Sequence, residues 1–168
     1  MDGNLLTLLK YNFNQTNAMK KICLLLFFTS ILILGKAQNS EDSVKMIVNQ
    51  LFTAMKNSDS TLLENCFADS AVLQTIVEKD GKIEIKNEPV SEFASVIKSL
   101  PKGAADEQIT FDVLKVEGTL AVVWAPYQFY FKGKFSHCGI DSFQLVRING
   151  EWRIQYLIDT RRKAGCRK

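Results

Sequence analysis

Two side chains capable of proton transfer lie close together near the end of the sequence. His137 is the only histidine of the chain, and Asp141 follows it by four residues. An imidazole titrates near neutral pH and can act as a general base, and a nearby carboxyl group can take part in the same proton transfer. The two residues therefore predict either a catalytic site or two polar groups at the mouth of a binding pocket.

Their spacing argues against a direct hydrogen bond between the two side chains. Residues i and i+4 of a regular strand are about 13 Å apart at ~3.3 Å per residue. A bulge at residues 138–139 would shorten this separation. We therefore expect His137 and Asp141 to bracket a small ligand, with Gln128 or Tyr130 on the adjacent strand as the nearer neighbour of His137.

Helices are expected to precede the strands that carry these residues. Apolar residues recur at helical spacing from residue 44 to residue 55, which predicts an amphipathic helix. A short helix is expected at residues 60–67. β-Branched runs flank Asp80-Gly81 and predict a hairpin, and a further helix is expected to open at Pro89 and to end at Pro101.

From residue 107 onward the sequence predicts strands joined by three tight turns. The turns are expected at residues 117–118, around Gly133 and at residues 149–150. Because a two-residue turn fixes the register, these turns predict which residues share a face of the sheet. The inner face is expected to be covered by the helices and to line a cone-shaped pocket. The predicted ligand-binding residues on that face are Phe111, Trp124, Gln128, Tyr130, Phe143 and Tyr156.

The same turns predict individual cross-strand partners. Across the first turn, Val113 is expected to face Val122. Across the last turn, Phe143 is expected to face Tyr156, and Asp141 to face Ile158.

The outer face of the predicted sheet is unusually apolar. A sheet face that meets solvent is mostly polar, so an apolar stripe there indicates a partner surface. We expect a homodimer formed by sheet-on-sheet contact, or else a stripe covered by loops or by the C-terminal tail. The predicted stripe consists of Val123, Ala125, Tyr127, Phe129, Phe131, Ile140, Val146 and Leu157.

The N-terminal part of the sequence is expected to be removed. Residues 19–38, MKKICLLLFFTSILILGKAQ, combine a basic start, a short apolar run and small residues at the end, which is typical of a secretory signal peptide. We assign residues 1–18 to an upstream extension from a misassigned start, 19–37 to the signal peptide and 38–168 to a single domain with a basic tail. An uncleaved anchor is the alternative. The domain is expected to be exported, periplasmic or secreted, without stable membrane insertion after cleavage.

The net charge and the cysteine and histidine content argue against nucleic-acid binding and metal binding. The formal charge of the chain is +3, and four lysines and one aspartate leave with residues 1–37, so the remaining domain is neutral and is not expected to bind nucleic acid. A single histidine and the absence of a CxxC motif predict no metal site, and no cofactor is expected. In an oxidising compartment Cys138 and Cys166 are a candidate disulfide, which leaves Cys66 as a buried free thiol.

The order of the predicted elements resembles that of the nuclear transport factor 2-like superfamily. The resemblance covers about residues 40–160 and is carried by the segments VKMIVNQLFTAMKNSD, LLENCFADSAV and FQLVRINGEWRIQYL. It implies an α+β fold in which a cone-shaped, curved antiparallel sheet wraps around N-terminal helices. Exported members that resemble this chain are described as SnoaL-like or lumazine-binding. The catalytic motifs of the superfamily's isomerases and dehydratases do not map onto this sequence residue by residue.

The superfamily contains enzymes, ligand-binding modules and dimerisation domains, so the fold does not by itself assign a function. The function expected first is non-catalytic binding of a small, partly apolar molecule in an aromatic-lined cone. A cofactor-independent isomerase, dehydratase or hydrolase that uses His137 and Asp141 is the first alternative. A dimerising interaction module with a filled cone is the second.

Overall fold

The helices lie where the sequence patterns predict them. The computed structural model describes residues 40–166, and it opens in a helix that runs through residues 40–57. The apolar stripe of this helix is buried, and α2 (Ser60–Glu64) follows, capped by an Asp59 side chain that accepts a hydrogen bond from the backbone of Leu62 at 2.9 Å. α3 (Val90–Ser99) begins after Pro89, as expected. The predictions for residues 1–37 lie outside the described residues.

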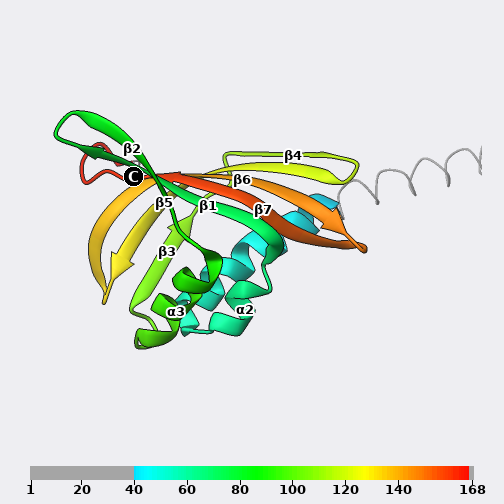
Figure 1. Cartoon of the computed structure of the whole chain (residues 1–168), viewed down its shortest axis with the longest axis horizontal. Coiled ribbons are helices and arrows are strands. Elements are labelled where there is room, and N and C mark those ends of the chain that lie inside the picture. Colours follow the sequence, from blue (N-terminus) through cyan, green and yellow to red (C-terminus); the bar gives the residue numbers. More distant parts are fainter. Residues whose placement is uncertain (1–39, 167–168) are drawn as a thin grey trace, which may run out of the picture. The chain divides into compact units, whose positions relative to one another are not determined.

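Seven strands form one curved sheet whose concave side is covered by the helices (Figure 1). Their order is β2-β1-β7-β6-β5-β3, and β4 also pairs with β5. β1 and β7 run parallel, whereas the other pairs are antiparallel, so the predicted wholly antiparallel sheet is wrong at that one pair. The strands are β1 (Phe67–Lys79), β2 (Lys82–Asn87), β3 (Ala105–Ile109), β4 (Val113–Glu117), β5 (Leu120–Phe131), β6 (Lys134–Ile148) and β7 (Glu151–Thr160).

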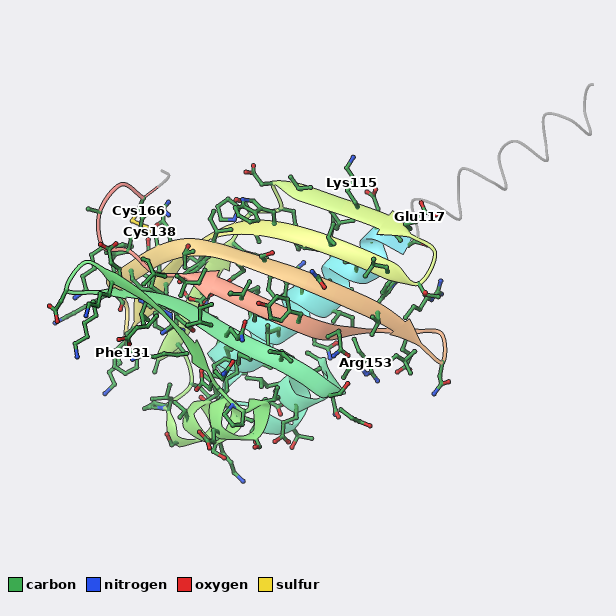
Figure 2. The ribbon with its side chains drawn as sticks, turned by 45° about the horizontal axis from the view of Figure 1, so that its top comes forward. Lys115, Glu117, Phe131, Cys138, Arg153 and Cys166 are labelled. Carbon is green, nitrogen blue, oxygen red and sulfur yellow. A yellow bond between two sulfur atoms is a disulfide. The ribbon has the colours of Figure 1, made fainter. Side chains whose placement is uncertain are left out.

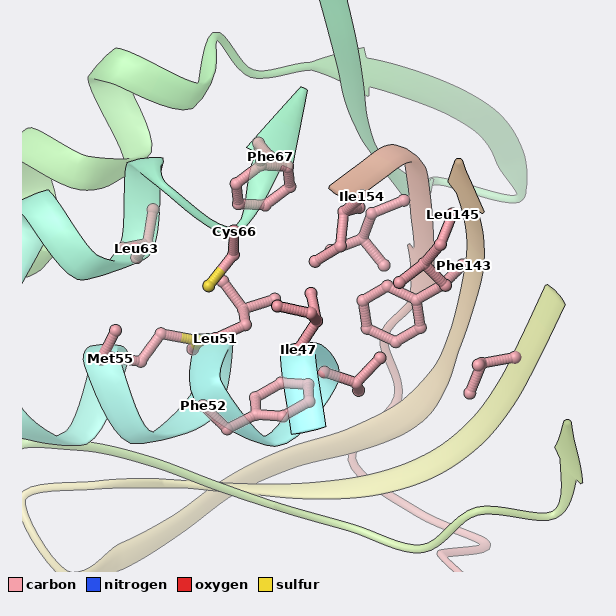
Figure 3. Packing of buried hydrophobic residues seen from close by; sticks show 14 of the residues in the cluster. Ile47, Leu51, Phe52, Met55, Leu63, Cys66, Phe67, Phe143, Leu145 and Ile154 are labelled. Carbon is pink, nitrogen blue, oxygen red and sulfur yellow. The ribbon is translucent and has the colours of Figure 1, made fainter. Parts of the chain in front are cut away.

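The hydrophobic core lies between the first helix and the inner face of the sheet (Figure 3). Phe52 from the helix meets Phe143 from β6 edge to face, with ring centroids 6.3 Å apart. Leu51, Leu145 and Ile154 complete the contact and are almost fully buried. Apolar burial of this kind is the main driving force that holds the helix against the sheet.

The turns on either side of β6 are placed as predicted, but the first turn of the meander is shifted. Glu117 faces Leu120, so the β4–β5 turn is formed by residues 118–119, and Val113 faces Trp124 rather than Val122. Because side chains alternate with a period of two, a shift of the partner by two residues leaves Val113 on the same face as Val122 and Trp124, as predicted.

A bulge between β5 and β6 inverts the predicted facing of β5. Tyr130 faces Phe135, but the next pair is Phe129 and His137, so Ser136 is an extra residue on β6. One inserted residue moves the rest of a strand to the opposite face relative to its partner. The odd-numbered residues of β5 therefore share the inner face with His137, and the even-numbered ones lie outside.

A second bulge, between β6 and β7, changes the facing of the last strand. Leu145 faces Ile154 and Gln144 faces Tyr156, so Gln155 is the extra residue. Phe143 consequently faces Leu157 instead of Tyr156, and Asp141 faces Asp159 instead of Ile158. Tyr156 lies on the outer face as a result.

The predicted outer stripe is therefore wrong in its composition. Val123, Ala125, Tyr127 and Leu157 are buried on the inner face. The large apolar side chains that are exposed on β4 and β5 are Val113, Leu120, Val122, Trp124 and Phe131.

Candidate functional site

A cavity of about 400 Å³ lies between the helices and the inner face of the sheet. Volumes of about 300–1,000 Å³ are typical of small-molecule sites. Its walls are mainly apolar and come from the first helix, α3 and β5. The apolar lining is Leu51, Phe52, Met55, Leu73, Phe93, Val96, Ile97, Leu100, Ala105, Phe129, Phe131 and Leu157, and the polar lining is Glu88, Glu107, Tyr127, His137, Asp141, Asp159 and Arg161.

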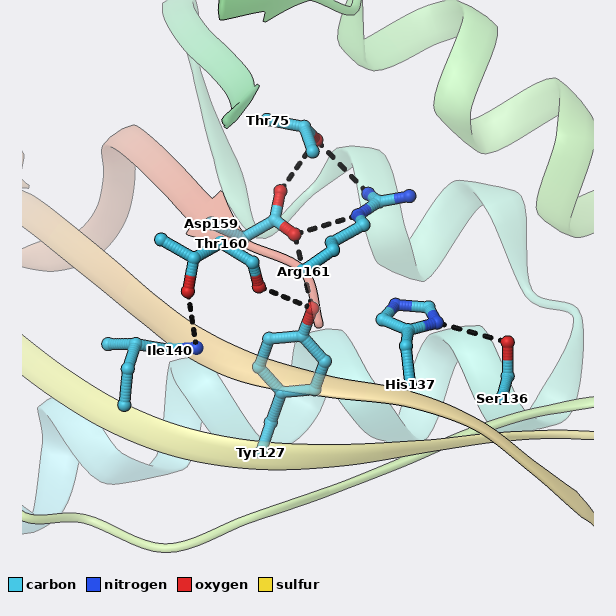
Figure 4. A network of polar contacts seen from close by, with 8 residues as sticks. All are labelled: Thr75, Tyr127, Ser136, His137, Ile140, Asp159, Thr160 and Arg161. Atoms are coloured by element: carbon cyan, nitrogen blue, oxygen red, sulfur yellow. Dashed lines mark hydrogen bonds and ion pairs between the residues drawn. The ribbon is translucent and has the colours of Figure 1, made fainter. Parts of the chain in front are cut away.

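The structure brings both predicted acid–base residues, His137 and Asp141, to this cavity. The imidazole of His137 lies edge-on to Tyr127, with centroids 5.7 Å apart, and tilted against Phe129 at 5.0 Å. Its Nδ1 is 3.0 Å from the hydroxyl of Ser136 (Figure 4). Burial, and secondly the positive charge of Arg161, lowers the pKa of His137. The ring is therefore neutral at neutral pH.

Asp141 lies beside another carboxyl group rather than beside a base. It is 3% exposed, and its neighbour is Glu107 on β3. Burial raises the pKa of Glu107 to about 7, and burial together with the Glu107 charge raises the pKa of Asp141 well above its usual range. Two neighbouring buried carboxyl groups do not both ionise readily, so the pair holds a proton near neutral pH.

Asp159, which faces Asp141 across the sheet, is the carboxyl group of the site that forms an ion pair with Arg161 (Figure 4). Its Oδ1 accepts a hydrogen bond from the hydroxyl of Thr75 at 2.6 Å. Its Oδ2 accepts from Nε of Arg161 at 2.8 Å and from the Tyr127 hydroxyl at 3.2 Å. Like charges directly opposite each other destabilise a sheet. The arrangement avoids this cost because Arg161 neutralises Asp159 and a proton neutralises Asp141.

Five polar residues of the cavity were not predicted from the sequence, and Tyr127 among them was expected on the outer face. They are Glu88, Glu107, Tyr127, Asp159 and Arg161. The signal for Asp159 was an acidic residue directly after the apolar residues 156–158, but without the bulge at residue 155 the predicted register places it on the outer face.

The residues predicted to bind ligand are not on the wall of this cavity. Trp124 is 44% exposed and lies on the outer face, and Tyr130, also outside, donates a hydrogen bond to Gln128 at 2.8 Å. Tyr156 donates to Gln74 at 2.6 Å on the outer face. Phe143 is fully buried in the core, and Phe111 packs against the core. The inward facing predicted for Trp124, Gln128, Tyr130 and Tyr156 is therefore wrong.

Cys138 and Cys166 form a disulfide at one end of β6 (Figure 2). Two backbone hydrogen bonds of 2.9 Å also join Cys138 to Arg162. Together these contacts tie the segment after β7, which begins with Arg161, to the strand that carries His137. Cys66 is a buried free thiol, and burial raises its pKa to about 11, so it is not reactive.

The carboxyl pair gives the fold a characteristic pH dependence. Because the pKa values of Glu107 and Asp141 are raised on folding, the folded state binds more protons than the unfolded state between about pH 4.5 and pH 7. We expect the free energy of unfolding to fall by about 1–3 kcal/mol from pH 5 to pH 8. Asp141→Asn should flatten this dependence in urea-unfolding curves. An unchanged slope in the variant would show that the pair does not share a proton.

Two further properties concern only residues 40–166. Within them, His, Cys, Asp and Glu side chains form no cluster that could hold a metal ion. No helix in this part of the chain is both long and apolar enough to cross a membrane.

Comparison with known proteins decides the family. A family model described as "Putative lumazine-binding" matches residues 39–156. The chain belongs to this lumazine-binding family. The fold of this chain is that of the nuclear transport factor 2-like superfamily, because it is similar to solved structures of that superfamily.

Two of the similar solved structures are described as proteins of unknown function. A nuclear transport factor 2-like protein of unknown function from Shewanella baltica is 17% identical, with a TM-score of 0.60 over 75% of this chain and 96% of that chain. Another, from Silicibacter pomeroyi, is 16% identical, with a TM-score of 0.58 over 75% of this chain and 98% of that chain. No curated protein matches the sequence. At these low sequence identities the similarity establishes the fold alone, so the function must be inferred from the geometry of the cavity.

Proposed function

We propose that the domain is an exported, non-catalytic binding protein that holds a small, partly apolar molecule in the cavity. The observation that carries the proposal is a cavity of about 400 Å³ with apolar walls and a buried polar end. Ligand sites typically combine these two features, since the apolar wall supplies affinity and a few polar groups supply orientation. The description of the family supports ligand binding in general terms.

The chemistry of the walls suggests a ligand that contains a ring. Four phenylalanines line the cavity: Phe52 on the first helix, Phe93 on α3, and Phe129 and Phe131 on β5. Aromatic side chains favour stacked or edge-to-face contact with a ring. The open cavity also argues against the filled cone of a pure interaction module.

Neighbouring residues with opposite facing provide a matched test of this proposal. Phe129 lines the cavity, whereas Tyr130 lies on the other face and contacts Phe135. Native mass spectrometry of residues 38–168, purified from the envelope of the host cell, should show a retained small molecule. Phe129→Ala should lose it or bind it at least about tenfold more weakly, and Tyr130→Ala should keep it. Equal retention by the two variants would place the ligand outside the cavity.

Proton-transfer catalysis is a second candidate function. It is favoured by one observation, since a neutral imidazole and a protonated carboxyl pair face the same cavity. Neighbouring titratable groups whose pKa values are shifted in opposite directions are typical of acid–base catalysis by isomerases, dehydratases and hydrolases. His137 and Asp141 would be the catalytic residues.

Catalysis can be separated from binding with the recovered ligand. If the protein transfers protons, incubation in deuterated water should change the mass of the ligand, and His137→Gln or Asp141→Asn should abolish the change. A ligand that is bound and returned unaltered by the unmodified protein would leave binding as the function.

We also propose that the outer sheet face forms a homodimer, now through different residues from those first expected. Val113, Leu120, Val122 and Trp124 are exposed and lie together on β4 and β5. Trp124→Glu should convert a dimer to a monomer in light scattering. A monomeric unmodified protein would overturn this proposal and leave the cavity unaffected.

A further inference from the structure

We propose that the ligand of this cavity is an organic cation, an amine or amidine attached to an apolar ring, whose nitrogen binds Asp141 beside Glu107. This inference rests on the proposed binding function and names the class of ligand.

The charges around the cavity are unbalanced toward the acidic side. Four carboxyl groups line it, contributed by Glu88, Glu107, Asp141 and Asp159, and Arg161 is the cationic group among the described lining residues. Arg161 is engaged, because it is bonded to Asp159 at 2.8 Å. Within residues 40–166, neither Glu107 nor Asp141 forms an ion pair with a cationic side chain.

Asp141 also has an unfilled hydrogen-bonding position. Its side chain is 3% exposed, and among the described residues no N–H or hydroxyl group donates to its Oδ2. Burying a polar atom without a partner costs about 1–3 kcal/mol. Buried polar groups are therefore almost always satisfied, and the exceptions call for a functional explanation. A ligand N–H in the cavity would satisfy this oxygen.

The carboxyl pair of Glu107 and Asp141 holds a proton because no neighbouring positive charge in the described part of the chain compensates two ionised carboxylates. The ionisable groups that face the pair are Tyr127 on β5, His137 on β6, and Asp159 and Arg161 at the end of β7. Burial raises the pKa of Tyr127 and lowers that of His137, so both are neutral at neutral pH. A bound cation would favour the ionised form of the pair and would release its proton to solvent.

The rest of the lining suits an aromatic cation. The rings of Phe129 and Phe131 line the same cavity, and a cation or a polarised ring is attracted to an aromatic face. A carboxylate and an amidine form charge-assisted, two-point hydrogen bonds. An anionic ligand would instead have to be buried beside the carboxyl pair at a high desolvation cost.

Three probes of nearly the same shape test the inference. Isothermal titration calorimetry at pH 6 with benzamidine, benzamide and benzoate compares a cation, a neutral amide and an anion. Benzamidine should bind at least about tenfold more tightly than the other two. Repeating the titration in buffers of different ionisation enthalpy should show release of about one proton per benzamidine bound. Equal binding of all three probes, or preference for benzoate, would overturn the inference.

Variants locate the effect at the carboxyl pair. Asp141→Asn should weaken benzamidine binding at least about tenfold and should weaken benzamide binding much less. Asp69→Asn removes the same charge from an exposed position of β1 and should change neither. Unchanged benzamidine affinity in Asp141→Asn would also overturn the inference.

A neutral apolar dye separates this inference from the proposed function. If Nile red binds to the unmodified protein and not to Phe129→Ala, while benzamidine does not bind, the cavity binds small molecules but not cations. If neither probe binds, both the inference and the proposed binding function fail.

Discussion

Gly139→Ala is expected to destabilise the fold by about 3 kcal/mol or more. A Cβ atom at Gly139 would lie 1.7 Å from the carbonyl oxygen of Thr160 and 2.7 Å from the ring of Tyr127. The oxygen belongs to the backbone at the end of β7, so it can move only if β7 moves away from β6. The displacement would also carry Asp159 and Arg161 away from the cavity, so we expect loss of ligand binding as well.

Urea unfolding measures the effect, and another glycine provides the control. Gly118 has a positive φ of 57°, and a Cβ atom added there would have no other atom within 4 Å, so Gly118→Ala should cost only about 1 kcal/mol through backbone strain. If the two substitutions cost the same, the close approach of β7 to Gly139 is not a determinant of stability.

Cys166→Ser is expected to cost about 3–4 kcal/mol. The disulfide to Cys138 joins residues 28 apart, and a cross-link over a loop of that length restricts the unfolded chain by about this amount. The segment that follows Arg161 should also become less ordered, because the two hydrogen bonds between Cys138 and Arg162 then hold it alone.

Reduction of the unmodified protein serves as the matched control for Cys166→Ser. Thermal unfolding with a strong reductant should give the same midpoint as the variant without it, and the reductant should not lower the midpoint of the variant further. A variant as stable as the oxidised protein would show that the bond contributes nothing to stability.

The sequence analysis predicted the elements well because their signals are local. The apolar spacing of residues 44–55 specifies a helix whatever its surroundings. Residues 149–150 form a tight turn, and the strands on either side of it pair from Ile148 and Glu151 as expected. His137 and Asp141 both line the cavity, because both lie on the inner face of β6.

The facing of β5 and of the end of β7 could not be predicted, because each depends on one extra residue. Neither Ser136 nor Gln155 differs in type from residues that occur in regular strands. The bulges form because of tertiary contacts. Burying Val123 and Ala125 against the helices stabilises the fold more than an uninterrupted ladder of strand hydrogen bonds would. Trp124 and Tyr130 were therefore assigned to the pocket, while Tyr127 and Asp159, which form its polar end, were not.

The parallel pairing of β1 with β7 has a consequence for the order in which the chain folds. Phe67 lies beside Ile154, and Leu73 beside Leu157, so the first and last strands of the sequence are neighbours. During synthesis from the N-terminus, β1 has no partner on that side until the final strand has left the ribosome. Long-range pairings of this kind slow folding and leave a strand edge exposed in the meantime. This edge of β1 therefore remains unpaired until almost the whole domain has been synthesised.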